Sequence, residues 1–185
     1  ARCAHPCHLR RRTDGPSRLV AAPAGHGAAE AALSARRDQL AMEWGMDPVP
    51  DEPLPPVGTL GFRVQRYGMN AWGDLFNTRQ RLALITFADQ VRRAHTQMLA
   101  EGYDPEFARA VATYLALPLD RAASSDNTLC RWQPAGEKIA DVFGRQALAM
   151  VWDFAETNLI DGKSRSWREL FKDTVNTCTH LSNTS

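Results

Sequence analysis

A run of prolines between residues 45 and 58 constrains the fold of this chain more than any other sequence feature. The run reads GMDPVPDEPLPPVG and holds five prolines in fourteen residues. Proline lacks a backbone N–H and fixes φ, so the run cannot form a helix or a central strand. We therefore predict an extended linker over residues 47–59, between an irregular part plus one helix (1–46) and a helical segment (60–185).

The segments on either side carry helical patterns, and the chain is predicted to be mainly α with at most a short β element. Residues 28–44 are rich in alanine, and apolar residues recur at helical spacing from Thr78 to Glu101. Asn77 is a favourable N-cap for the second helix, and Gly102 is a favourable residue to end it.

Two more helices and one strand are expected from shorter signals. Asp104 followed by Pro105 predicts a helix start, and Pro118 should kink or restart that helix. Residues 166–169, SWRE, have the spacing of a capping box and predict a last helix. Residues 60–69 show a short alternation of apolar and polar side chains, which favours a strand.

The stretch from Asn127 to Glu156 contains a cysteine, an Arg-Trp pair and a Pro-Ala-Gly step. We interpret residues 133–136 as a turn, 137–143 as a short helix and 145–156 as a second helix.

Motifs for nucleophilic or phosphate chemistry are missing from the sequence. It has no Gly-x-Ser-x-Gly elbow, no Walker-type loop and no Gly-x-Gly-x-x-Gly. Cys130 has no histidine near it in sequence, and a buried Cys that packs as a small hydrophobe is the better interpretation. Asp153 and Glu156 could pair on a helix, or they could line its solvated edge.

Composition narrows the class of protein. Twenty-two basic and twenty-one acidic residues nearly cancel, so contacts with nucleic acid would have to come from local patches. Four widely spread cysteines favour a reduced, cytoplasmic protein, and no apolar run is long enough for a membrane span. The cluster of Cys3, His5, Cys7 and His8 offers zinc ligands without a second knuckle, so an unliganded terminus is the alternative.

Two long stretches carry a family resemblance. They are residues 50–84, PDEPLPPVGTLGFRVQRYGMNAWGDLFNTRQRLAL, and residues 104–158, DPEFARAVATYLALPLDRAASSDNTLCRWQPAGEKIADVFGRQALAMVWDFAETN. Both resemble an internal segment of large bacterial and archaeal adenine-specific DNA methylases, which carry a zinc ribbon and an N-terminal domain of unknown function. The resemblance covers residues 47–182 in the right order. It implies that residues 1–46 include a remnant of the zinc-ribbon region.

The resemblance implies a parent enzyme with an α/β Rossmann-like fold in a prokaryotic cytoplasm. That enzyme would use S-adenosylmethionine to methylate N6 of adenine in DNA, after flipping the base from the helix. The family's glycine-rich cofactor turn and its Pro-Pro-Tyr tetrapeptide match no position here, so no catalytic residue carries over. We expect the chain alone to be inactive and to bind no cofactor.

Basic and aromatic side chains supply the predicted DNA contacts of this segment: Arg63, Arg66, Arg131, Trp132, Lys138 and Arg145. Basic side chains bind phosphate, and tryptophan can stack on a base. The alternative is that Trp132 and Trp152 pack in a core that the charges merely cover. A second possible function is a free-standing helical module that binds nucleic acid or protein in a DNA modification or defence system.

Overall fold

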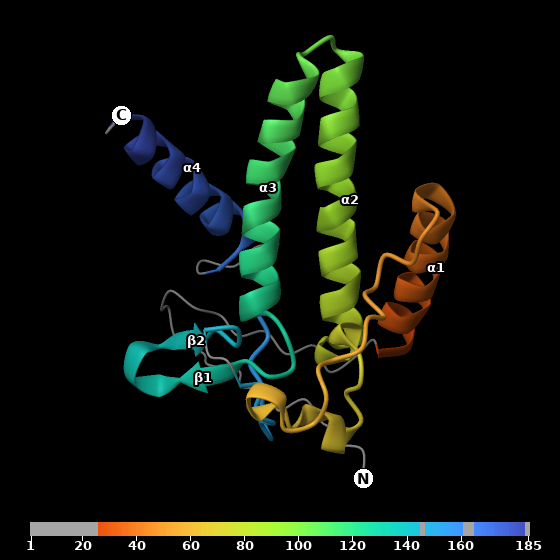
Figure 1. Ribbon diagram of the computed structural model, residues 1–185, viewed down its shortest axis with the longest axis vertical. Coiled ribbons are helices and arrows are strands. Elements are labelled where there is room, and N and C mark those ends of the chain that lie inside the picture. Colours follow the sequence, from red (N-terminus) through yellow and green to blue (C-terminus); the bar gives the residue numbers. More distant parts are fainter. Residues whose placement is uncertain (1–25, 145–146, 161–164, 184–185) are drawn as a thin grey trace.

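In the computed structural model of the protein, residues 26–144, 147–160 and 165–183 are described. Over these residues the fold is mainly helical, with four α-helices and one two-stranded antiparallel sheet, which confirms the predicted fold class. The helices α2 (Thr78–Ala100) and α3 (Pro105–Ser125) form an antiparallel hairpin (Figure 1). The first helix, α1 (His26–Trp44), lies beside α2, and α4 (Trp167–Asn183) starts beside α3 and diverges from it (Figure 1).

The predicted capping residues begin both helices of the hairpin. The Asn77 side chain accepts a hydrogen bond from the Gln80 backbone N–H at 3.0 Å, and the Gln80 side chain accepts one from the Asn77 N–H at 2.9 Å. The Asp104 side chain accepts from the Phe107 N–H at 2.9 Å. These bonds satisfy N–H groups that have no partner inside the helix. The third helix continues through the buried Pro118, so the predicted restart there does not occur.

A buried carboxylate joins α1 to α2. Asp89 on α2 binds Arg36 on α1 at 2.5 Å and Arg93 on its own helix at 2.8 Å. Nearby, α1, the proline run and α2 each contribute one side chain to a small core of Leu40, Val49 and Ile85. The contact is therefore both apolar and ionic.

The proline run contains no helix, as predicted, and it is held along residues 70–73. The Leu54 N–H donates to the Asn70 carbonyl at 2.7 Å, and the Gly73 N–H donates to the Pro50 carbonyl at 3.0 Å. Leu54 is buried, and it contributes to the main core below the helical hairpin. That core gathers Leu54, Phe62, Val64, Leu75, Leu129 and Leu148.

The predicted strand over residues 60–69 is wrong. Two 3-10 helices stand in its place, η1 (Thr59–Gly61) and η2 (Val64–Tyr67). Gly58, Gly61 and Gly68 have φ values of 89°, 82° and 90°, and these left-handed positions turn the chain repeatedly. Phe62 and Val64 are both buried, so the alternation in the sequence reflects burial without an extended backbone.

The predicted helices over residues 137–143 and 145–156 are also wrong within the described residues. The turn over residues 133–136 is confirmed, but it connects strands β1 (Arg131–Gln133) and β2 (Lys138–Ala140) through the 3-10 helix η4 (Pro134–Gly136). Residues 147–156 contain no helix, and their backbone pairs with distant segments. The Leu148 carbonyl accepts from the Arg63 N–H at 3.3 Å, and the Ala155 N–H donates to the Cys130 carbonyl at 2.9 Å.

The last helix begins where the capping signal predicts. The Ser166 hydroxyl accepts from the Glu169 N–H at 3.5 Å, and Trp167 stacks on Phe87 of α2 with ring centroids 4.4 Å apart. Leu170 is buried. Further along the helix the apolar residues Phe171, Val175 and Leu181 are exposed. Only the first turn of α4 is therefore anchored in the core.

The packing of the proline run generates a prediction about Gly73. A Cβ at this position would lie 2.5 Å from the Pro50 carbonyl oxygen and 2.8 Å from Val49 Cγ1. We expect Gly73→Ala to lower the free energy of unfolding by about 1–3 kcal/mol, because the crowded backbone must shift. Gly27→Ala is the control, since Gly27 lies in α1 with open space around it and alanine favours a helix. Urea denaturation of the three proteins would contradict the prediction if Gly73→Ala matched the parent chain.

Candidate nucleic-acid interface

The β1–β2 hairpin sorts its side chains onto two faces. Its register pairs Arg131 with Ala140, Trp132 with Ile139 and Gln133 with Lys138. Because alternate residues of a strand point to opposite faces and paired residues share a face, Arg131 and Lys138 lie on the same face. Both are exposed. The structure therefore brings these two predicted DNA contacts together.

Trp132 lies on the opposite face of the hairpin. It is partly buried and packs against a small core of Cys130, Ile139 and Ala155. The indole therefore packs against the inner face of the hairpin, in agreement with the alternative prediction that Trp132 belongs to a core.

Arg63 and Arg66 lie at η2, away in sequence from the hairpin. Arg63 is the N-cap of this 3-10 helix and Arg66 is in its last turn, and both are exposed. A 3-10 helix has about three residues per turn, so the two side chains are one turn apart. Arg145 and the Cys3, His5, Cys7 and His8 cluster lie outside the described residues.

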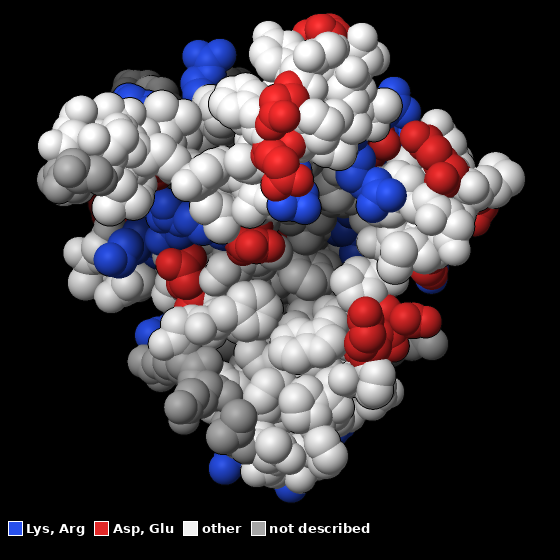
Figure 2. Space-filling model, turned by 45° about the horizontal axis from the view of Figure 1, so that its top comes forward, with Lys and Arg blue, Asp and Glu red and all other residues white. Residues whose placement is uncertain are grey.

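Most of the other arginines have an acidic partner, whereas the predicted basic DNA contacts have none among the described residues. Among the described residues, no ion pair forms at Arg63, Arg66, Arg131 or Lys138. By contrast, acidic partners hold Arg36, Arg37, Arg79, Arg81, Arg93, Arg109, Arg121 and Arg165. Figure 2 shows one face of the molecule, where acidic and basic side chains are interspersed around uncharged areas. Any contact with phosphate on that face would be local.

A polar anchor supports the base of the molecule, at the end of α3. Asp126 is only 3% exposed, and its carboxylate accepts a hydrogen bond from the Thr157 N–H at 2.8 Å and one from the Gln80 amide at 3.4 Å. The Thr157 hydroxyl donates to the Ser125 carbonyl at 3.2 Å. Glu156 binds Arg79 at 2.6 Å and also accepts from the Asn77 side chain. The start of α2, the end of α3 and residues 156–157 thereby form one unit.

Burial raises the pKa of Asp126 to about 7. The neighbouring Glu156 carboxylate also raises it, whereas the Thr157 N–H, the Gln80 amide and the Arg79 guanidinium lower it. Desolvation dominates because no cation among the described residues contacts the carboxylate directly. Glu156 is held by Arg79, and Asp153 is exposed outside any helix, so the structure does not bring Asp153 and Glu156 together as a helical pair.

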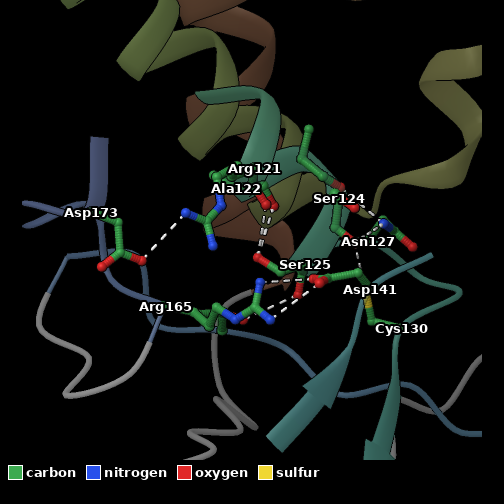
Figure 3. Close-up of polar contacts among 11 residues, drawn as sticks. Arg121, Ala122, Ser124, Ser125, Asn127, Cys130, Asp141, Arg165 and Asp173 are labelled. Atoms are coloured by element: carbon green, nitrogen blue, oxygen red, sulfur yellow. Dashed lines mark hydrogen bonds and ion pairs between the residues drawn. The ribbon is translucent and has the colours of Figure 1, made fainter. Parts of the chain in front are cut away.

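The thiol of Cys130 is not set up as a nucleophile. It is buried and lies 3.5 Å from the Ser124 carbonyl oxygen (Figure 3). Burial raises its pKa to about 12, so the thiol stays protonated at neutral pH. This confirms the expectation of a small buried hydrophobe.

Ion pairs close the loops around the hairpin. Arg165 donates to both carboxylate oxygens of Asp141, at 2.8 and 3.1 Å, directly before α4 (Figure 3). Arg121 near the end of α3 binds Asp173 on α4 at 3.3 Å (Figure 3). The Asn127 amide donates to the Ala123 carbonyl at 2.9 Å and so caps the end of α3. These contacts are structural and leave the outer face of the hairpin open.

Metal-binding clusters and membrane-spanning helices are both absent from the described residues. No group of three or more His, Cys, Asp or Glu side chains there could hold a metal ion. Within the same residues, no helix is long and apolar enough to cross a membrane.

Sequence reasoning missed the anchoring role of Asp126 and the exposure of Trp152. Asp126 belongs to the polar run SSDN, whose only signal was the end of a helix. Trp152 stands among apolar residues, which is typical of a core position.

Comparison with protein-family models, with curated proteins and with solved structures finds no match for this chain.

The raised pKa of Asp126 predicts a pH-dependent stability. Its ordinary value is 3.8, so the folded state holds the proton more tightly than the unfolded state. The stabilisation by this group is complete below about pH 4 and is lost as the pH rises through about 7. Asp126→Asn removes the titrating carboxyl group. We therefore expect the melting temperature of the variant, relative to that of the parent, to be several degrees higher at pH 8 than at pH 4.

Differential scanning calorimetry of both proteins measures this difference. Asp153→Asn is the control, because Asp153 is exposed and its replacement should change stability by less than about 0.5 kcal/mol at either pH. A melting difference for Asp126→Asn that is the same at both pH values would contradict the prediction.

Proposed function

We propose that this chain is part of an S-adenosylmethionine-dependent DNA methyltransferase, in which it holds DNA beside a Rossmann-like catalytic core. The assignment to this family rests on the resemblance over residues 47–182. The expected target, N6 of adenine, rests on the same resemblance. The observation that supports a DNA-holding role is the outer face of the hairpin. There Arg131 and Lys138 are exposed together, without an acidic partner among the described residues.

The chemistry of this face suits phosphate. A guanidinium or ammonium group without a local counter-charge keeps its donors free for phosphate oxygens, and it releases condensed counterions from DNA on binding. Such contacts position a protein on the duplex but do not read sequence. This segment would accordingly orient DNA, while the methyl transfer and the choice of base belong to the core. Alone, the chain is inactive.

A second candidate is a free-standing helical module that binds a partner in a DNA modification or defence system. The exposed apolar residues Phe171, Val175 and Leu181 on α4 favour it, because grouped exposed apolar side chains mark surfaces that meet other proteins. The neighbouring reading frame distinguishes the candidates. A glycine-rich strand and turn upstream and a Pro-Pro-Tyr motif downstream, both in frame, support the methyltransferase. Natural start and stop codons at the two ends of this chain support the module.

Charge reversal on the hairpin tests the DNA-holding role. In the protein encoded by the full reading frame, we expect Arg131→Glu with Lys138→Glu to weaken duplex DNA binding at least tenfold at low salt. The slope of log affinity against log salt should fall by about 2, because two phosphate contacts are lost. Fluorescence anisotropy over a salt series measures both quantities.

Arg168→Glu with Lys172→Glu is the matched control. Both residues are exposed on α4, and the double change alters the net charge by the same amount. An unchanged affinity and salt slope in the hairpin variant would refute the DNA-holding role. An equal loss in both double variants would show that only net charge matters.

A cofactor-binding measurement tests whether the S-adenosylmethionine site lies outside this chain, in the rest of the enzyme. The 185-residue chain should not bind radiolabelled S-adenosylmethionine in equilibrium dialysis, because the glycine-rich turn that holds it in such enzymes is missing. The protein of the full reading frame should bind it. Stoichiometric binding by the 185-residue chain would contradict the assignment of the cofactor site to the rest of the enzyme.

A further inference from the structure

One tryptophan differs from the other four in its surroundings. Trp44, Trp72, Trp132 and Trp167 are all partly buried. Trp44 lies under the Arg92 guanidinium, Trp72 packs on Phe62, and Trp167 stacks on Phe87. Trp152 is 72% exposed. A large aromatic side chain left open to water in a chain that at least partly buries its other indoles needs a reason.

A second exposed aromatic ring accompanies Trp152. Tyr67 is 52% exposed, and its ring lies 6.2 Å from that of Trp152 at an interplanar angle of 81°. In this edge-to-face arrangement one ring supports the other and leaves an aromatic face available. The two residues come from distant parts of the chain, so tertiary structure builds the pair.

The segments that carry the pair are held firmly. The Arg63 N–H donates to the Leu148 carbonyl at 3.3 Å, and Gly61 approaches Ala147 so closely that a Cβ on the glycine would lie 2.9 Å from the alanine Cβ. Leu148 is buried in the main core. The rings therefore project from a rigid base, which lowers the entropy cost of using them for binding.

The charge beside the pair is basic. Arg66 precedes Tyr67 in η2, Arg63 lies one turn earlier, and neither has an ion pair among the described residues. Asp153, which follows Trp152, is the one acidic residue in 60–70 and 147–153. Exposed aromatic rings, on a segment that also carries guanidinium groups without an ion pair among the described residues, suit single-stranded nucleic acid, whose bases stack and whose phosphates pair with cations.

We infer that Tyr67 and Trp152, with Arg63 and Arg66, form a platform that stacks an unpaired nucleobase of single-stranded DNA and holds its adjacent phosphate. The inference rests on the proposed DNA-holding function and adds to it a second contact, specific for unpaired DNA. The hairpin face made by Arg131 and Lys138 binds duplex phosphates, whereas the platform takes a base that has left the duplex. Trp132 is packed beneath the hairpin and plays no part in this stacking.

Fluorescence anisotropy with three labelled probes tests the platform in the 185-residue chain and in the protein of the full reading frame. The probes are a thymine single strand of about 12 nucleotides, an abasic strand of equal length and a duplex. We expect Trp152→Ala to weaken binding to the thymine strand about 5- to 100-fold and to change duplex binding less than about twofold. Trp152→Phe should retain most of the affinity, and the parent should bind the abasic strand more weakly than the thymine strand.

Two further variants complete the test. Arg63→Gln with Arg66→Gln should reduce the salt slope for the thymine strand by about 1.4, as expected for two phosphate contacts on a single strand. Met42→Ala is the control, because Met42 is an exposed apolar side chain on α1, away from the platform, and its removal should change nothing. Melting temperatures confirm that each variant folds.

Three results would overturn the inference. They are unchanged thymine-strand binding in Trp152→Ala, an equal loss for strand and duplex, or equal affinity of the parent for abasic and thymine strands. If the hairpin double variant still weakens duplex binding, the platform alone fails and the DNA-holding function stands. If neither strand nor duplex binds, both fail, and the exposed aromatic pair belongs to a protein contact.

Discussion

The hydrogen bond from the Thr157 backbone N–H to the buried Asp126 carboxylate, 2.8 Å long, is the contact on which the base of the molecule depends. A buried carboxylate without donors is costly, so Asp126 holds Thr157 and Gln80 in place. Next to it, the Thr128 N–H and hydroxyl both donate to the Leu75 carbonyl, at 2.8 and 2.7 Å. These bonds join the start of α2, the end of α3 and the segment that returns from the β hairpin.

Both proposed nucleic-acid contacts are built on that base. The Ala155 N–H donates to the Cys130 carbonyl, so the anchored segment also supports the first strand of the hairpin. The outer face of the hairpin is then free to present Arg131 and Lys138. The same segment also carries Trp152 to Tyr67. Rigid supports under exposed basic and aromatic groups favour binding, because these groups lose little conformational entropy when a ligand binds.

The helices were predictable because their signals are local. Asn77 and Asp104 satisfy N–H groups only three residues away, so neighbouring sequence contains the whole interaction. The region between α3 and α4 was not predictable in this way. There the N–H of Ala155 and the carbonyl of Leu148 have partners far along the chain, and no helical pattern can indicate such pairing. The alternation at Phe62 and Val64 likewise indicated burial but not the glycine-dependent turns that produce it.

Local sequence was enough to predict the mainly helical class, the capped starts of the two long helices and the non-helical proline run. Local hydrogen bonds and the covalent constraints of proline act whatever the rest of the chain does. Long-range packing, in contrast, makes Asp126 an anchor, turns Trp132 inward and leaves Trp152 exposed to water beside Tyr67. Burial, and the meeting of side chains distant in sequence, depend on how whole segments pack, and no local pattern contains that information.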